Sequence, residues 1–276
     1  MVSDSLVSQL KRQASVIRRH VIELGTEHVC HVGGALSATD LMTALYFHVL
    51  KVDPGNPRWH DRDYFILSKG HCALALYGAL AERGFFPVEA LKTFEQKGSV
   101  LAGHPTLKVP GVEVATGSLG HGLPIGMGIA AACRAEGAPN RVFVMIGDGE
   151  MQEGSVWEAA LAAPRFGLDN LTAIIDQNRF QATNAVENLI PVDPLGDKWR
   201  SFRWNVIEID GNDMAQVVAA LGPESEGRQA GRPTAIIAHT VKGKGVPCIE
   251  DTPRAHYTRL TPEEAAEALR DLEVVA

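Results

Sequence analysis

The chain has 276 residues, of which 45% are hydrophobic and 21% are charged, and its formal net charge is −7. These proportions are typical of a globular protein, and the acidic balance gives no support to nucleic-acid binding. No apolar run approaches the roughly 20 residues that a membrane-spanning helix needs. We expect a single domain over residues 1–276, because no linker-like change of composition interrupts the chain.

The cysteines indicate the redox setting. Cys30, Cys72, Cys133 and Cys248 have no paired spacing, so the sequence predicts neither a disulfide framework nor a zinc site. A reducing, cytoplasmic location fits this pattern.

The N-terminus predicts an amphipathic helix rather than a signal peptide, because it lacks the charged-then-apolar layout of one. Five aliphatic side chains recur on one helical face, namely Leu6, Leu10, Ile17, Val21 and Leu24. Its basic residues could also belong to an organellar presequence. Asp4 and Glu23 interrupt that basic character, so a solvated helix face is the favoured interpretation.

Beyond this segment, helical and strand patterns alternate. Helices are expected over residues 40–50, 73–83, 125–134, 155–163 and 214–221, and strands over 64–67, 142–146, 171–176, 205–209 and 234–238. A last helix over 261–272 carries a capping-box pattern, with Thr261 before Pro262 and Glu264 following. Strands that alternate with helices predict an α/β fold, with a mostly parallel sheet that has helices on both faces.

Two of the predicted strands end in hard oxygen ligands. Asp148 lies between Gly147 and Gly149 after one apolar run, and Asn178 follows the next run. Gly-Asp-Gly alone is a common turn. Here, however, it follows a strand and is followed by a helix-like stretch over 150–161, a second strand and Asn178. This combination favours a ligand site at the carboxyl ends of the strands. Mg²⁺ prefers such oxygens, and a backbone carbonyl just past Asn178, at Phe180, could supply a third.

Two nearby patterns bear on which cofactor is bound. The backbone N–H groups of Gly149 and Glu150 would open the following helix, where a diphosphate is favoured. Residues 126–131 fit the dinucleotide pattern G-x-G-x-x-A, but no strand precedes them. Close packing of a helix is the favoured explanation for Gly126 and Gly128, rather than a nicotinamide site.

Several longer stretches together resemble the transketolase family, from about residue 10 to residue 270. They begin at Cys30 (CHVGGALS), Leu67 (LSKGH), Gly103 (GHP), Gly111 (GVEVATGSLG), Gly147 (GDGEMQEG), Leu168 (LDNLTAIIDQN) and Val241 (VKGKGV). The resemblance implies the thiamine-diphosphate-binding fold of the family's N-terminal domain. It also implies thiamine diphosphate and Mg²⁺, or another divalent cation such as Ca²⁺ or Mn²⁺, as cofactors.

The resemblance assigns roles to particular residues. His71 matches a histidine that contacts the cofactor's phosphate and thiazolium region, while His31 and His104 match histidines of the substrate channel. His256 aligns more loosely with a later active-site histidine. Glu153 matches a glutamate of the network that links the family's two active sites, although a carboxylate favoured at a helix start is an equally good explanation. The loop expected against the aminopyrimidine ring is Gly117, Ser118 and Leu119.

The chain also departs from the family pattern. Cys30 and His121 stand where glycine and glutamine are usual, and Arg179 and Thr183 replace the usual Gly and Asp after the metal motif. His256 lacks the usual Trp-His-Gly surroundings. We expect these differences to affect which acceptor sugar is used and what His256 does, and not to abolish cofactor binding.

The activity implied is transfer of a two-carbon ketol unit from a ketose or ketose phosphate to an aldose or aldose phosphate. The family's pyrimidine-binding and C-terminal domains have no counterpart in this sequence, and the glutamate that activates the cofactor belongs to the former. We therefore expect the N-terminal subunit of a split transketolase, paired as α₂β₂ with a separately encoded C-terminal subunit.

Two alternatives remain open. The chain could be a component of another thiamine-diphosphate enzyme, such as a deoxyxylulose-phosphate synthase or a dehydrogenase E1 α chain. It could also be a non-catalytic cofactor-binding remnant. The sequence around His71 and His104 favours transketolase.

Overall fold

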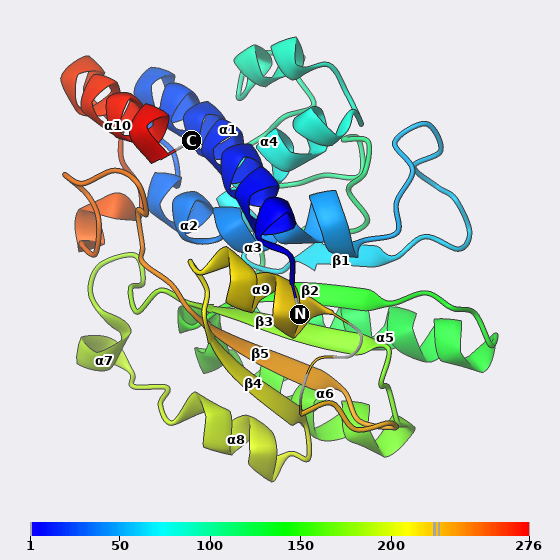
Figure 1. Ribbon diagram of the computed structural model, residues 1–276. Coiled ribbons are helices and arrows are strands. Elements are labelled where there is room, and N and C mark those ends of the chain that lie inside the picture. Colours follow the sequence, from blue (N-terminus) through cyan, green and yellow to red (C-terminus); the bar gives the residue numbers. More distant parts are fainter. Residues whose placement is uncertain (1, 223–224, 226, 276) are drawn as a thin grey trace.

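The computed structural model describes residues 2–222, 225 and 227–275. Within them, the strands form one parallel sheet in the order β1-β2-β3-β5-β4 (Figure 1). The strands are β1 (Tyr64–Leu67), β2 (Val142–Gly147), β3 (Leu171–Gln177), β4 (Asn205–Asp210) and β5 (Thr234–His239). The predicted α/β class with a parallel sheet is confirmed, and every predicted strand lies within one residue of its observed bounds.

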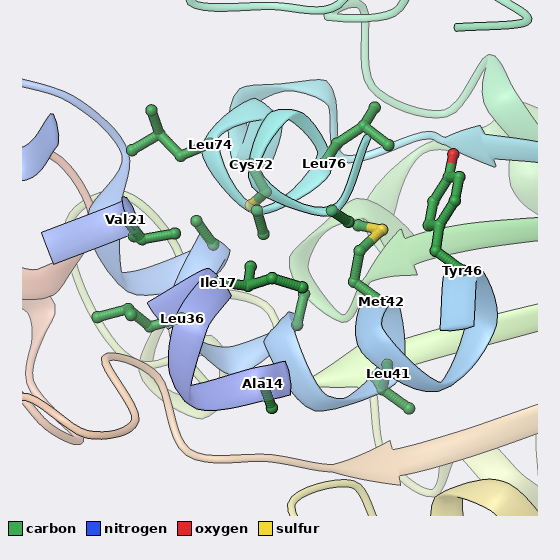
Figure 2. Close-up of a cluster of buried hydrophobic side chains, with 14 of the residues drawn as sticks. Ala14, Ile17, Val21, Leu36, Leu41, Met42, Tyr46, Cys72, Leu74 and Leu76 are labelled. Carbon is green, nitrogen blue, oxygen red and sulfur yellow. The ribbon is translucent and has the colours of Figure 1, made fainter. Parts of the chain in front are cut away.

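One face of the sheet packs against the larger group of helices. This group comprises α1 (Asp4–Glu27), α2 (Val32–Ser37), α3 (Thr39–Ala44), α4 (Ala73–Arg83), α9 (Met214–Leu221) and α10 (Pro262–Val275). Alternate strand residues such as Phe143, Met145 and Ile174 point into this core. Figure 2 shows its centre, where Ile17 and Val21 of α1 lie among side chains of α2, α3 and α4.

The other face packs against α5 (Gly122–Ala135), α6 (Gly154–Ala162) and α8 (Leu195–Ser201), with α5 and α6 behind the sheet in Figure 1. The intervening strand residues, including Val144 and Ile175, point toward them. Gly126 is needed here, because a Cβ on it would lie 2.4 Å from Val144 Cγ2, whereas a Cβ on Gly128 would meet nothing within 4 Å. The packing explanation is thus supported for Gly126 only.

The remaining elements are short. They are η1 (Leu45–Val49), η2 (Gly70–Cys72), η3 (Val88–Thr93), η4 (Gly149–Gln152), η5 (Ala163–Phe166), α7 (Val186–Leu189) and η6 (Pro253–Ala255). The predicted capping box is confirmed: Glu264 N donates to Thr261 Oγ1 at 3.2 Å, and Thr261 N donates to Glu264 Oε2 at 2.9 Å. None of the helices formed by the described residues is long and apolar enough to cross a membrane.

Two helix predictions were wrong in detail. The helix expected over 40–50 ends as α3 at Ala44 and continues as a π-helical turn, in which Leu50 N donates to Leu45 O. The helix-like stretch over 150–161 is interrupted, because η4 ends at Gln152 and Glu153 is extended, with a ψ of 127°. Gly149 and Glu150 therefore open a short 3₁₀ turn rather than a long helix, and any contribution of their N–H groups to anion binding is local.

Candidate active site

Asp148 and Asn178 lie at the carboxyl end of the sheet, as predicted. Strands β2 and β3 are adjacent and parallel, and Gly147 pairs in register with Asp176. The Asp148 carboxylate is held by backbone groups: Oδ2 accepts from N of Arg179, the residue after Asn178, at 2.6 Å, and Oδ1 accepts from Gly149 N at 2.8 Å. The turn between Asn178 and Phe180 thus closes over the Asp148 carboxylate.

This turn also gathers the two other predicted oxygens. Phe180 N donates to Asn178 Oδ1 at 3.2 Å, so the amide oxygen faces the same turn as the Phe180 carbonyl. The turn requires a positive φ at Arg179, which has 67°. The family pattern has glycine at this position, and Arg179 in its place carries backbone strain of about 1 kcal/mol.

The electrostatics of Asp148 fit a divalent cation. Its side chain is buried, and no ion pair to it occurs within the described part of the chain. Burial, followed by the nearby charge of Asp176, raises its pKa to about 6. No group of three or more His, Cys, Asp or Glu side chains that could by themselves hold a metal ion occurs among the described residues. One carboxylate, one amide and one carbonyl is a donor set that suits Mg²⁺, with the remaining positions left to phosphate and water.

A buried polar network supports the amide of Asn178, and the sequence analysis did not anticipate it. Asp176 forms an ion pair with the Lys69 ammonium and accepts from the hydroxyls of Ser37, at 2.7 Å, and Thr240. Asn178 Nδ2 donates to the same carboxylate at 3.3 Å. Because a carboxylate only accepts, this contact keeps the amide oxygen turned toward the turn at Phe180. The Lys69 charge holds the pKa of Asp176 low despite its burial.

Glu150 forms a second network that fixes the cofactor loop. Its buried carboxylate accepts from the Ser68 hydroxyl, from Gly120 N at 2.8 Å and from Gly147 N at 3.1 Å. Gly122 N in turn donates to Ser68 Oγ at 3.1 Å. The Glu150 side chain thus joins the loop before α5 to the end of β2. The predicted role of Glu150, contact with the cofactor's phosphates through its backbone N–H, stays a prediction.

Four predicted histidines come together next to this edge. The ring centroid of His31 lies 5.1 Å from that of His71, 6.1 Å from that of His104 and 5.2 Å from that of His256. Tyr257 completes the group, with its ring 4.7 Å from that of His31. Four segments distant in sequence therefore present aromatic and imidazole groups to one space.

Three of these imidazoles, those of His31, His71 and His256, are uncharged at neutral pH. Burial is the main cause, and it lowers the pKa of His31 to about 4, of His71 to about 2 and of His256 to about 3. The Lys69 and Lys242 ammonium groups and the other histidines act in the same direction. A neutral imidazole offers one donor and one acceptor, which is what handling the protons of sugar hydroxyls requires.

Lys242 connects the histidines to the metal turn. Its buried ammonium donates to Phe180 O at 2.9 Å and to Gln181 O at 3.2 Å, and lies 3.0 Å from His256 Nδ1. Burial lowers its pKa to about 8. In the sequence, Lys242 was noted only as part of the stretch VKGKGV that begins at Val241. A lysine placed among glycine and valine residues was the one local feature that could have marked it as a site residue.

The remaining predicted residues lie on the loop before α5 and around η4. Gly117 has a φ of 146°, and a Cβ on it would lie 3.1 Å from His104 Cδ2, so the loop runs directly against the histidine cluster. Ser118 is exposed and Leu119 half-buried. Glu153 is exposed beside Gly120 and forms the N-cap of α6 without a side-chain capping bond. It therefore stands at a helix start, and its role in a network between two active sites stays a prediction.

The fold and this site define a class of protein: an α/β protein with a buried polar site at the carboxyl edge of a parallel sheet, beside a cluster of histidines. The comparison with known families is more specific. The transketolase thiamine diphosphate binding domain matches residues 11–274. The chain belongs to this transketolase family.

Close relatives are of similar length. One of them, a subunit of an apulose-4-phosphate transketolase from Phocaeicola vulgatus, is 40% identical, over 96% of this chain and 94% of its own. A 6-deoxy-6-sulfo-D-fructose transketolase subunit from a Clostridium species is 42% identical, over 96% of each.

The solved structures are longer. The transketolase of Campylobacter jejuni has a TM-score of 0.88 at 28% identity, covering 99% of this chain but 43% of that one. The transketolase of Leishmania mexicana has a TM-score of 0.86 at 27% identity, covering 99% of this chain and 42% of that one. This chain therefore spans less than half of these solved transketolases.

Proposed function

We propose that this chain is the N-terminal subunit of a transketolase, which transfers a two-carbon ketol unit from a ketose or ketose phosphate to an aldose or aldose phosphate. The observation that carries the proposal is the meeting of two groups at one sheet edge: the buried carboxylate of Asp148, which forms no ion pair with a described residue, and the cluster of His31, His71, His104 and His256.

In this proposal Asp148, Asn178 and the Phe180 carbonyl hold Mg²⁺ or a similar divalent cation, and through it the diphosphate. Thiamine diphosphate, when bound, supplies the electron sink that carbon–carbon cleavage needs. Gly117, Ser118 and Leu119 would lie against its ring, and the N–H groups of Gly149 and Glu150 would be directed at its phosphates. The donor set and the unbalanced charge of Asp148 support this assignment.

The histidines would act on the sugar. His31 and His104 are placed to exchange protons with its hydroxyl groups, because burial keeps His31 neutral and the two rings are in contact. His71 and His256 lie closer to Lys69 and Lys242 and would line the cofactor side. Tyr257, whose ring lies 4.7 Å from that of His31, would line the same space.

We also propose that the chain forms one cofactor-binding domain over 1–276 and pairs as α₂β₂ with a separate C-terminal subunit. Three relatives that match along nearly their whole length carry the word subunit in their names. Exposed apolar side chains on neighbouring elements of one face, Ile125, Leu161 and Phe166, are consistent with a covered surface. The four free thiols fit the reducing, cytoplasmic setting that we propose.

Product analysis tests the activity. The candidate C-terminal subunit is co-purified with the chain, and the complex is supplied with thiamine diphosphate, Mg²⁺ and a ketose labelled with ¹³C at its first two carbons. Label in a new ketose two carbons longer than the added aldose supports ketol transfer. In a parallel assay, formation of a deoxyxylulose phosphate from pyruvate and glyceraldehyde 3-phosphate, or decarboxylation of another 2-oxo acid by the same complex, would instead identify another thiamine-diphosphate enzyme.

A further inference from the structure

Glu95 is a residue that the proposed function does not use, and its backbone is unusual. It follows η3 with a φ of 55°, a conformation that favours glycine or asparagine over glutamate. The position is firmly held: Glu95 N donates to Leu101 O at 2.8 Å, and the preceding Phe94 is buried, with its ring 5.4 Å from that of His28. An exposed glutamate is therefore fixed in a conformation that other residues adopt at lower cost.

The side chain lies beside the histidine cluster. A Cβ on Gly103 would come within 2.7 Å of Glu95 Oε1, so the carboxylate lies against the residue that precedes His104. Its negative charge also raises the pKa of the Cys30 thiol, after the larger effect of burial, and Cys30 precedes His31. Gly103 and Cys30 belong to different segments, and both place the Glu95 carboxylate at the rim of the site, on the side of His31 and His104.

The carboxylate is also unpaired. It makes no hydrogen bond or ion pair with any residue that the structure describes. The site's described cations are engaged elsewhere: Lys242 is buried on Phe180 and Gln181, and Arg179 pairs with Asp251 at 3.4 Å. The rim near His104 therefore carries an exposed negative charge with free acceptor positions.

We propose that Glu95 is a specificity-determining residue, which accepts hydrogen bonds from hydroxyl groups of the acceptor sugar and disfavours a sugar that carries an anionic group at this position. This inference rests on the proposed function, and names the substrate class that this rim would favour: an acceptor that is neutral and hydroxylated where it passes Gly103 and His104. A carboxylate and a dianionic phosphate a few ångströms apart in water repel by an amount that corresponds to about a tenfold or larger change in affinity.

The test measures kcat/KM for an aldose and for its terminal phosphate ester, using the complex with the C-terminal subunit. Glu95→Gln keeps a hydrogen-bonding side chain and removes the charge. The ratio of kcat/KM for the phosphorylated aldose to kcat/KM for the free aldose should rise about tenfold in Glu95→Gln and rise further in Glu95→Lys. The matched control is Glu89→Gln, which removes an exposed carboxylate on η3 and should leave the ratio unchanged.

Each outcome is decisive. If the ratio of kcat/KM for the phosphorylated aldose to that for the free aldose changes equally in Glu95→Gln and Glu89→Gln, or changes in neither, the inference is overturned while ketol transfer stays in place. An absence of ketol transfer in the native complex would overturn the proposed function, and this inference with it.

Discussion

Replacing Asp148 with asparagine should stabilise the metal-free chain while abolishing its response to Mg²⁺. The carboxylate is buried without a cation partner, and its pKa is raised from 3.8 to about 6. At about 1.4 kcal/mol per pH unit, the ionised form costs the folded state about 3 kcal/mol at pH 7.5. For an acid whose pKa is raised by folding, that cost is fully present above pH 6 and disappears as the pH falls below about 4.

The substitution also has a cost. The carboxylate accepts from Arg179 N and Gly149 N, and the asparagine oxygen can serve only one of them well, so an unpaired N–H subtracts about 1–3 kcal/mol. The net effect expected is a gain of about 0–2 kcal/mol in the free energy of unfolding. For a chain of this size each kcal/mol corresponds to about 2–4 °C in Tm.

The assay is thermal and urea unfolding at pH 7.5, first in EDTA and then with Mg²⁺ and thiamine diphosphate. The native chain should gain stability on adding both, and Asp148→Asn should not, so that the order of stability reverses. A variant that is less stable than native by more than about 2 kcal/mol in EDTA, and is still stabilised by Mg²⁺, would refute the assignment of Asp148 as an unbalanced metal ligand.

Three further predictions concern the surrounding structure. Lys69→Met leaves Asp176 buried without its cation and should lower the free energy of unfolding by about 3–5 kcal/mol in urea titrations; a loss below 1 kcal/mol would contradict the ion pair. Gly126→Ala should lower the free energy of unfolding by about 1–3 kcal/mol, because the added Cβ would clash with Val144. Gly128→Ala, which adds a Cβ in open space, should raise it by about 0.5–1 kcal/mol. Equal effects of the two variants in urea titrations would disprove the packing argument. Because folding lowers the pKa of His256 to about 3, the unfolded chain takes up the proton first, and stability falls as the pH drops below 6.5. When the free energy of unfolding is measured between about pH 7 and 5, His256→Gln should show a shallower decline than the native chain. An identical decline in both would exclude this contribution of His256.

The sequence was most informative where function depends on local motifs. Asp148 and Asn178 each follow an apolar strand, and parallel strands place their carboxyl ends at one edge, so their proximity could be predicted without a structure. The histidine cluster was reached differently, through the family resemblance, because nothing in the spacing of His31, His104 and His256 shows that they meet.

What could not be predicted are the partners that support these residues. Lys69 and Asp176 are 107 positions apart, and Ser68 and Glu150 are 82 apart. Such pairs depend on how helices are stacked over the sheet, which local patterns do not specify. For the same reason neither the partners of the Glu150 carboxylate nor the position of Glu95 beside Gly103 could be foreseen.

The most direct test of the central claim is turnover of this chain with and without its candidate C-terminal subunit. The assay contains thiamine diphosphate, Mg²⁺, xylulose 5-phosphate and ribose 5-phosphate, with free xylulose and ribose in parallel. We predict ketol transfer only when both subunits are present, because the activating glutamate is expected on the other one. Turnover by the isolated chain at ordinary enzymatic rates, or none by a stable complex with either sugar pair, would contradict the account.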